Sequence, residues 1–397
     1  MTGRRRAWRP EESPGPRLER EGRVVRIRCL AAARQALRER RRTTQAGFTA
    51  EFIPKGVFRH HPILISDGPL HDEQRRKVGR FLAPKVVASH YGALMAEVAE
   101  RLLTDAQEAG EFDLSDLALL YTVEVTAEVV GLTESSIPDM ARRLVSFFNQ
   151  PPLDITRPDL GRTRRDWMRA AVNGIVPVLR FYWADVRRAI KVRRREPRED
   201  IISHLIAEGY SDTDILVECV TYGTAGMVTT REFICMAAWH LLDDAELRGR
   251  YLAGDQQERV AVLAEILRLE PVVGHLYRRV VEAFDLHDGD ATVTAEVGDL
   301  IDVATRETNT DVEAVGGCPL ELRPGRGMPR GVDATGLTFG DGAHKCPGQP
   351  LAIAEADALL IRLLPTATLR AEPTIGWDDL IEGYALTGLR VVMGPKS

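Results

Sequence analysis

The 397-residue sequence lacks any apolar run long enough to cross a bilayer, which takes about 20 consecutive apolar residues. It also lacks the short apolar core of a signal peptide. The formal net charge is only −5, so the excess of positive charge that is typical of nucleic-acid-binding proteins is absent. We therefore expect a cytoplasmic protein that has neither a membrane nor a nucleic acid as its partner.

Paired cysteines are absent as well. The cysteines are widely spaced, their number is odd, and none belongs to a CxxC motif, which argues against a disulfide framework and against a zinc site. A cysteine with a special role must therefore be recognised from its local sequence. The five cysteines are Cys29, Cys219, Cys235, Cys318 and Cys346.

No internal repeat and no flexible linker divides the chain, so we expect a single domain over residues 1–397. With 44% apolar and 28% charged residues, the composition is that of a globular protein with a deep core. Residues 1–20 contain a cluster of arginines and are expected to form a flexible basic tail. These arginines are Arg4, Arg5, Arg6 and Arg9.

What the sequence does contain is mostly helical periodicity, with apolar residues at three- and four-residue spacing. Helices are predicted over residues 86–109, 116–131, 163–193, 212–246, 257–270 and 349–364. Short strands are predicted over residues 22–28, 279–286, 291–303 and 388–393. Irregular segments rich in proline or glycine cover residues 1–20, 148–162 and 307–345. The pattern predicts a mainly α fold, in which a large helical part carries a small strand-rich lobe.

The long irregular segment ends in residues 339–348, FGDGAHKCPG, directly before a predicted helix. Gly340 and Gly342 permit positive φ and let the backbone approach a flat ligand closely. Cys346 lies just before the helix N-terminus, where unpaired N–H groups and a partial positive charge lower a thiol pKa. Pro347 suits the start of that helix. A thiolate held in this way is a soft, electron-rich metal ligand.

This string resembles the signature FxxGxHxCxG of the cytochrome P450 family at every fixed position. The matching residues are Phe339, Gly342, His344, Cys346 and Gly348. The resemblance implies the P450 fold and a haem b whose iron has Cys346 as its axial ligand, between a long distal helix and the proximal helix that follows the cysteine. It also implies that Phe339, Gly340 and Gly348 lie against the cofactor, where Gly348 leaves room beside the sulfur.

Glu265 and Arg268 match the ExxR motif of the same family. Their i,i+3 spacing places both side chains on one helix face, where they can pair. In the family this pair is structural and lies on the proximal side of the haem. Its usual third partner is an arginine of the irregular segment, and here either Arg323 or Arg326 could complete the triad.

Further matches concern the haem propionates. His71 and Arg75 fit the HxxxR motif of soluble bacterial members, one helical turn apart, and arginine suits forked contact with a carboxylate. The resemblance assigns both residues to propionate binding. Arg278 is the expected further contact, with Arg279 as the competing choice, and His344 is the remaining one.

Residues 225–230, AGMVTT, resemble the family pattern A/G-G-x-D/E-T-T of the oxygen-handling helix. The resemblance implies that Gly226 loosens the helix to admit O2 and that Thr229, followed by Thr230, donates a hydrogen bond to bound oxygen. The chain departs from the pattern at Val228, where the family has an acid that relays protons.

Three accounts of proton delivery remain open. Ordered water and Thr229 could suffice if another acid such as Glu232 supplies protons. The substrate could instead bring its own polar group. In the third account the enzyme uses peroxide, which arrives with its protons, or it runs an oxidation other than hydroxylation.

The resemblance places the substrate over the distal face of the haem. The expected walls are the loop before His71, the region of residues 145–165, the long helix, the segment after Pro271 and a C-terminal turn. A small to medium-sized apolar or aromatic metabolite would fit such walls. Each candidate could equally be ordinary core, and the candidates are Phe147, Phe148, Tyr222, Met227, Val228, Val272, His275 and Leu386.

The leading hypothesis is a monooxygenase that uses O2 and electrons from a ferredoxin and its reductase. It would hydroxylate a small molecule or form a ring or bond oxidatively, in the manner of natural-product biosynthesis. The second hypothesis is a peroxide-driven haem-thiolate peroxygenase or oxidase, suggested by Val228. The third is a non-catalytic protein that binds ligands through its haem.

Overall fold

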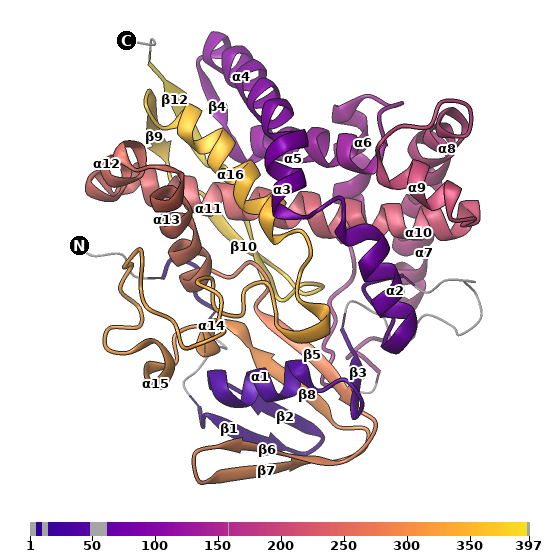
Figure 1. Ribbon diagram of the computed structural model, residues 1–397, viewed down its shortest axis with the longest axis vertical. Coiled ribbons are helices and arrows are strands. Elements are labelled where there is room, and N and C mark those ends of the chain that lie inside the picture. The colour runs from indigo at the N-terminus through magenta and orange to yellow at the C-terminus, as the bar shows by residue number, and fades with distance from the viewer. Residues whose placement is uncertain (1–4, 10–14, 48–61, 158, 395–397) are drawn as a thin grey trace.

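The computed structural model describes residues 5–9, 15–47, 62–157 and 159–394 as one mainly helical body with most strands gathered at one end (Figure 1). The first α-helices are α1 (Leu30–Arg38), α2 (Gly68–Gly79), α3 (Pro84–Val86), α4 (Gly92–Ala109), α5 (Leu114–Val130), α6 (Ile137–Val145), α7 (Arg164–Phe181) and α8 (Arg187–Arg193). They are followed by α9 (Ile201–Ala207), α10 (Asp212–Tyr222), α11 (Thr229–Asp243), α12 (Ala245–Ala253), α13 (Gln256–Leu269), α14 (Thr305–Thr308), α15 (Val312–Val315) and α16 (Gln349–Leu363).

Five shorter helical segments among the described residues differ from the α form. The π-helical segments are η2 (Val87–Tyr91), η4 (Tyr182–Val186) and η5 (Gly223–Val228), and the 3-10 segments are η3 (Ser146–Phe148) and η6 (Gly342–His344). Segment η5 joins α10 to α11, so the long predicted helix is continuous but widens at its centre. Such π turns are frequent at functional sites.

The strand-rich lobe is built on a five-stranded sheet in the order β1-β2-β8-β5-β3. Its strands are β1 (Leu18–Glu21), β2 (Val24–Ile27), β3 (Thr43–Gln45), β5 (His275–Val280) and β8 (Leu300–Ala304). Strands β2 and β8 pair in parallel, with Val24 opposite Leu300. The first strands of the chain are therefore completed only by strands from its last third.

The remaining strands form small sheets. One has the order β4-β12-β9, and two are the hairpins β6-β7 and β10-β11. These strands are β4 (Glu111–Asp113), β6 (Phe284–Asp288), β7 (Ala291–Ala295), β9 (Ala367–Ala371), β10 (Thr374–Asp378), β11 (Gly383–Thr387) and β12 (Arg390–Met393).

Two hydrophobic cores correspond to the two parts of the fold. The larger core lies among the helices and includes Tyr121, Met236 and Leu360. The smaller core lies in the lobe, where α1 packs over the strands through Leu37, close to Ile301. The prediction of a large helical part with a small strand-rich lobe is confirmed.

The predicted helix limits are close to those observed for α5, α13 and α16. Two predicted strands are wrong in extent. The segment 279–286 contains the turn between β5 and β6, and the segment 291–303 contains the turn between β7 and β8. Apolar alternation continues through both turns, so periodicity alone could not find them.

The prediction of a flexible basic tail is wrong for the described residues of that segment. Arg5 donates to the carbonyl oxygens of Leu269 and Arg306, and Arg6 pairs with Asp243. Arg9 pairs with Asp379 and Glu382, and Ala7 is fully buried. Residues 18–20 belong to β1. The arginines thus attach the N-terminal segment to acidic groups and carbonyls of the helical part.

Among the described residues, no helix combines the length and apolarity that a bilayer crossing would need.

Candidate functional site

The cysteine loop, residues 339–348, is held by an internal backbone hydrogen bond before α16 begins. The Cys346 N–H donates to the Phe339 carbonyl oxygen at 2.7 Å, and Gly340 and Gly342 have φ of 72° and 70°. A Cβ on Gly342 would lie 2.4 Å from the carbonyl oxygen of Leu37 in α1, so only glycine fits there. The expectation for Gly340 and Gly342 is confirmed by these backbone angles.

Two details of the loop differ from expectation. Helix α16 begins at Gln349, and the proline of its first turn is Pro350 rather than Pro347. A Cβ on Gly348 would lie 3.7 Å from the Cys346 sulfur, which is ordinary contact, so space beside the sulfur does not by itself require glycine.

The Cys346 sulfur lies where two backbone N–H groups meet. Burial raises the pKa of this thiol above its usual value, while the N–H groups of Gly348 and Gln349 and the charge of Arg75 act to lower it. The prediction of these N–H groups is correct, but the predicted net lowering of the pKa is wrong for the metal-free chain, because burial dominates. Coordination to a metal requires loss of the proton and would favour the thiolate.

Helix α1 holds the far side of the loop. Arg34 and Arg38 both donate to the Asp341 carboxylate, at 3.0 and 2.9 Å. Burial acts to raise the pKa of Asp341, but these two arginines and the Gly342 N–H outweigh burial, so the pKa is lowered. The Asp341 carboxylate also accepts from the Gly342 N–H at 2.7 Å. The loop conformation is therefore stabilised by a helix more than 300 positions earlier in the chain.

The structure brings the residues predicted to bind propionates into one cluster. The rings of His71 and His344 stack with their centroids 4.1 Å apart, and Arg75 donates to the carbonyl oxygen of Lys345. His344 contacts Asp67 through Nε2 at 3.1 Å. Burial, with the charges of His344 and Arg75, lowers the pKa of His71 to about 4.

Arg278 joins this cluster from β5. It donates to the Gln45 side chain at 2.5 Å, and burial lowers its pKa to about 10, against the attraction of Asp67. Burial also raises the pKa of Asp67, but His344, the Gln45 N–H and Arg278 outweigh this effect and lower it overall. Arg279, the competing choice, points to the other face of the strand and donates to Gly298.

The cluster fits a cofactor that carries carboxylates. Among the described residues, neither Arg75 nor Arg278 forms an ion pair, although burial lowers the pKa of both. His71 Nδ1 is buried and has no hydrogen-bond partner there. Buried cations normally have a partner. The two propionates of a haem would supply the missing negative charge beside Cys346.

The ExxR pair is buried and has its third member. Arg268 donates to both carboxylate oxygens of Glu265 at 2.7 Å. Arg326 donates to Glu265 through Nε at 3.1 Å, whereas exposed Arg323 contributes only its backbone N–H, at 3.0 Å. Arg326 therefore completes the triad. Its remaining donors bind carbonyl oxygens of Val315, Gly317, Cys318 and Glu321.

The widened turn η5 carries the residues predicted to handle oxygen. Ala225 is exposed and Tyr222, Gly226 and Thr229 are partly exposed, so one face of this helix is open at its centre. The Thr229 hydroxyl donates to the Ala225 carbonyl oxygen at 2.5 Å. In this rotamer Thr229 can accept a hydrogen bond from a ligand but cannot donate one, which differs from its expected role. Thr230 and Met227 point into the core instead.

Glu232, the alternative acid, is not free. Its Oε2 accepts from the Leu386 N–H at 2.7 Å, and its Oε1 is paired with Arg231. It therefore joins α11 to β11, and the expectation that it supplies protons loses its support.

The predicted wall residues fall into two groups. Met227 is fully buried in the main core, and His275 is paired with Asp302 at 2.6 Å, which argues for structural roles. The pKa of His275 is raised, since Asp302 overcomes the effect of burial. The others are buried or partly buried apolar and aromatic side chains, namely Phe147, Phe148, Tyr222, Val228, Val272 and Leu386. Residues 48–61 of the loop before His71 lie outside the described residues.

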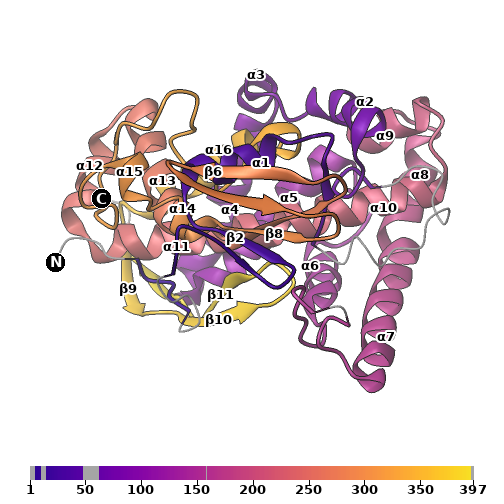
Figure 2. The ribbon, with the colours of Figure 1, turned by 90° about the horizontal axis from the view of Figure 1, so that it is seen from below.

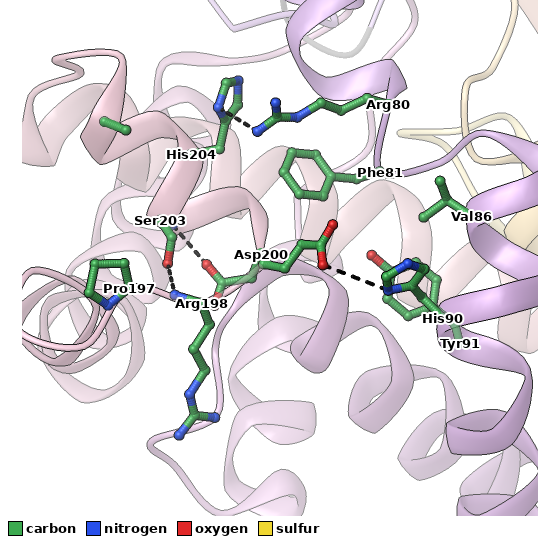
Figure 3. Close-up of a pocket in the computed structure, with 12 residues that line it drawn as sticks. Arg80, Phe81, Val86, His90, Tyr91, Pro197, Arg198, Asp200, Ser203 and His204 are labelled. Carbon is green, nitrogen blue, oxygen red and sulfur yellow. Dashed lines mark hydrogen bonds and ion pairs between the residues drawn. The ribbon is translucent and has the colours of Figure 1, made fainter.

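A separate cavity of about 470 Å³ lies between the end of α2, η2 and α9 (Figure 3). Arg80 contacts His204 across it at 2.8 Å, and Ser203 and Asp200 line its floor. None of the residues that the sequence singled out lines this cavity.

Sequence reasoning missed Asp67 and Gln45 in the propionate cluster. Asp67 precedes α2 by one residue and Gln45 ends β3, and neither belongs to a matched motif. The pairing of β3 with β5 sets Gln45 opposite Arg278, and the Gln45 N–H donates to Asp67 at 3.0 Å.

Known proteins resemble this chain over most of its length. A family model described as Cytochrome P450 matches residues 260–374. Cytochrome P450 144 of Mycobacterium tuberculosis is 27% identical over 323 residues, which cover 80% of this chain and 69% of that protein. Erythromycin C-12 hydroxylase of Saccharopolyspora erythraea is 27% identical over 297 residues, covering 72% of this chain and 68% of that protein.

Solved structures agree in fold. P450BioI in complex with an acyl carrier protein has a TM-score of 0.75 and 20% identity, over 93% of this chain and 92% of that one. A structure described as one of the unusual cytochrome P450-like monooxygenases of microbial secondary metabolism has a TM-score of 0.79 and 18% identity, over 96% and 97%.

The matched region 260–374 contains both the buried Glu265–Arg268 pair and the cysteine loop. The fold, the loop that presents Cys346 and the sequence relatives all lead to the same assignment. The chain belongs to the cytochrome P450 family of haem-thiolate monooxygenases, in its bacterial form.

Proposed function

We propose that the chain oxidises a small to medium-sized apolar or aromatic metabolite, with haem b held by Cys346 and electrons supplied by a ferredoxin. The observation that carries this proposal is the cysteine loop beside partly buried Arg75 and buried Arg278, neither of which forms an ion pair with a described residue. When bound through a thiolate, haem iron supplies activation of O2 for oxygen transfer to a substrate. Erythromycin C-12 hydroxylase, a relative, supports a role in natural-product biosynthesis through hydroxylation or oxidative bond formation.

The chain's own residues would hold the cofactor from three sides. Cys346 binds from the proximal side, and His71, Arg75, Arg278 and His344 receive the carboxylates. Phe339, Gly340 and Gly348 form the loop surface beside the cofactor. On the distal side Gly226 and Thr229 belong to the open face of the long helix, and buried Thr230 would support it from the core side. Substrate would contact side chains near that turn, with Phe147, Tyr222, Val228, Val272 and Leu386 as the candidates.

A different acid of the same helix is the better proton source. Glu218 and Tyr222 lie on α10 at four-residue spacing, and Ala225 and Thr229 continue the same face. Burial raises the pKa of Glu218 to about 7, although Tyr222 and the Ile63 N–H oppose the shift. Neither Glu218 Oε2 nor the Tyr222 hydroxyl has a hydrogen-bond partner of normal geometry among the described residues. A carboxyl that titrates near neutral pH can exchange protons with water along this face.

Changing Glu218 to glutamine is expected to remove a pH dependence of stability. Because the folded-state pKa of about 7 exceeds the usual 4.5, Glu218 stabilises the fold most below pH 4.5 and loses this contribution as pH rises through 7. Between pH 4.5 and 7 the free energy of unfolding of Glu218→Gln should therefore fall less than that of the wild type. Above pH 7 it should be higher than that of the wild type. Urea unfolding at several pH values measures this, with exposed Glu246→Gln as the control. Parallel curves for wild type and Glu218→Gln would contradict the buried carboxyl.

The proposed function is tested by turnover of the purified, haem-loaded chain. Compounds that change its visible spectrum on binding are incubated with O2, ferredoxin, its reductase and NADPH. We expect product that contains one atom from isotopically labelled O2. Equal turnover with peroxide alone would favour the peroxygenase, the one alternative that Val228 supports. O2 consumption with no product from any binding compound would favour the ligand-binding protein.

A further inference from the structure

Helix α7 presents an apolar ridge to solvent. The ridge consists of Met168, Val172, Ile175, Val176 and Leu179 of α7 and Trp183 of the following segment η4, which are 68, 58, 59, 38, 50 and 58% exposed. These are six of the twelve large apolar side chains that the described residues expose, and the others are scattered. Single exposed apolar residues are normal on a protein, whereas a continuous set marks an interaction site.

The ridge lies on the outer side of a helix that is anchored by its other side. Pro177 and Phe181 of α7 are buried, and Phe181 meets Phe147 edge-on at 6.0 Å between ring centroids. Figure 2 shows α7 at the periphery, extending away from the body of the molecule. The ridge side chains are therefore largely uncovered by the described part of the chain.

The spacing along the ridge is that of a helix-pairing seam. Met168, Val172, Ile175 and Leu179 follow one another at intervals of four, three and four residues. This is the pattern of the apolar a and d positions of a coiled coil. Such a seam is narrower than the apolar face of a helix packed into a core.

Positive charge borders the seam. Arg164, Arg165, Arg169, Arg180 and Arg187 are exposed on α7 and α8, and none forms an ion pair with a described residue. At about 3.6 residues per turn, Arg169 and Arg180 fall along one border of the ridge, and the Arg187 guanidinium lies over the Trp183 ring, 4.8 Å from its centroid. The nearby Asp166 is engaged with Thr163 at the start of the helix.

We propose that this ridge is the docking site for an acidic amphipathic helix of a protein partner. Apolar side chains of that helix would cover the seam while its carboxylates pair with the bordering arginines. A second copy of the chain fits poorly, because pairing two such helices would bring arginines together. A bilayer surface fits less well than a helix, because the arginines confine the apolar face to a narrow strip. The proposal goes beyond the proposed function and does not depend on it.

The test uses the haem-loaded full chain and two labelled synthetic helices. Both have leucine at the a and d positions, and the flanking e and g positions carry glutamate in one and lysine in the other. Fluorescence anisotropy should show binding of the glutamate peptide, weakened by added salt, and binding of the lysine peptide about tenfold weaker or more. Val172→Asp and Arg180→Glu should each reduce affinity for the glutamate peptide about tenfold.

Val297→Asp is the matched control, because Val297 is also 58% exposed but lies away from α7. It should bind like the wild type, and all variants should keep the wild-type thermal midpoint. Equal affinity for both peptides, or no effect of Val172→Asp, would overturn the proposal. The proposal would also be overturned if the wild type sedimented with phosphatidylcholine–phosphatidylglycerol vesicles and Val172→Asp did not. A concentration-dependent dimer of the wild type that Val172→Asp abolishes would overturn it as well. None of these measurements depends on catalysis, so their outcome neither supports nor contradicts the proposed function.

Discussion

Changing Cys346 to serine is expected to abolish the thiolate-type absorption spectrum of the reduced, carbon-monoxide-bound protein. A serine hydroxyl is a harder and much less acidic ligand than a thiol, and it does not donate electron density to iron in the same way. Monooxygenase turnover should fall to background with the spectrum. The measurement is the difference spectrum of the reduced variant with and without carbon monoxide.

The control for this change lies in the same chain. Cys318 is free and exposed, so Cys318→Ser should keep the wild-type spectrum and haem content. If Cys346→Ser retained the thiolate-type spectrum while Cys318→Ser lost it, the wrong sulfur would have been assigned. Haem content per chain distinguishes loss of the ligand from loss of the cofactor.

Changing Arg326 to alanine is expected to lower the free energy of unfolding by roughly 1–3 kcal/mol, the usual cost of leaving buried hydrogen-bond acceptors unpaired. The Arg326 side chain is 4% exposed and binds Glu265 together with four carbonyl oxygens of the irregular segment. Its loss leaves the four carbonyl oxygens without this donor, while Glu265 keeps its bonds from Arg268 and from the Arg323 N–H. Urea unfolding measures the change, and the rate of haem release should rise.

Arg323→Ala is the matched control for Arg326→Ala. Arg323 is exposed and reaches Glu265 only through its backbone N–H, which alanine retains. Its effect should remain within about 0.5 kcal/mol, as for most surface substitutions. Comparable losses in the two variants would mean that the segment, rather than the Arg326 ion pair, sets the stability.

The parts of the site that could be predicted are those encoded locally. In the cysteine loop the positive φ of Gly340 and Gly342 and the N–H groups near Cys346 all belong to consecutive residues. The Glu265–Arg268 pair likewise follows from one helical turn. A pattern of neighbouring residues is sufficient wherever the geometry is made by neighbours.

The parts that could not be predicted depend on contacts between distant segments. The choice between Arg323 and Arg326 depends on how the irregular segment folds around Glu265. The role of Glu232 is fixed by a backbone N–H in β11, more than 150 positions later. The pKa of Cys346 depends on burial by the whole fold.

The same distinction applies to the fold. The long helices α5, α13 and α16 were predictable because their apolar stripe repeats over many turns. The widening at η5 was not, since the adjoining residues 232–241 are buried on all sides of the helix and no single apolar stripe reveals the phase shift of a π turn. The basic N-terminal segment looked like a solvated tail because its acidic partners, such as Asp243 and Glu382, lie far along the sequence.

The long reach of α1 and β2 has a consequence for how a ribosome must produce this protein. Residues 15–47 leave the exit tunnel first, yet β2 needs β8 and α1 needs Asp341, both of which are translated much later. Until then the open strands of the lobe can pair with any other nascent chain. A shortened chain that stops before β8 would therefore leave β2 without its parallel partner, and we expect it to aggregate although most of its helices are complete.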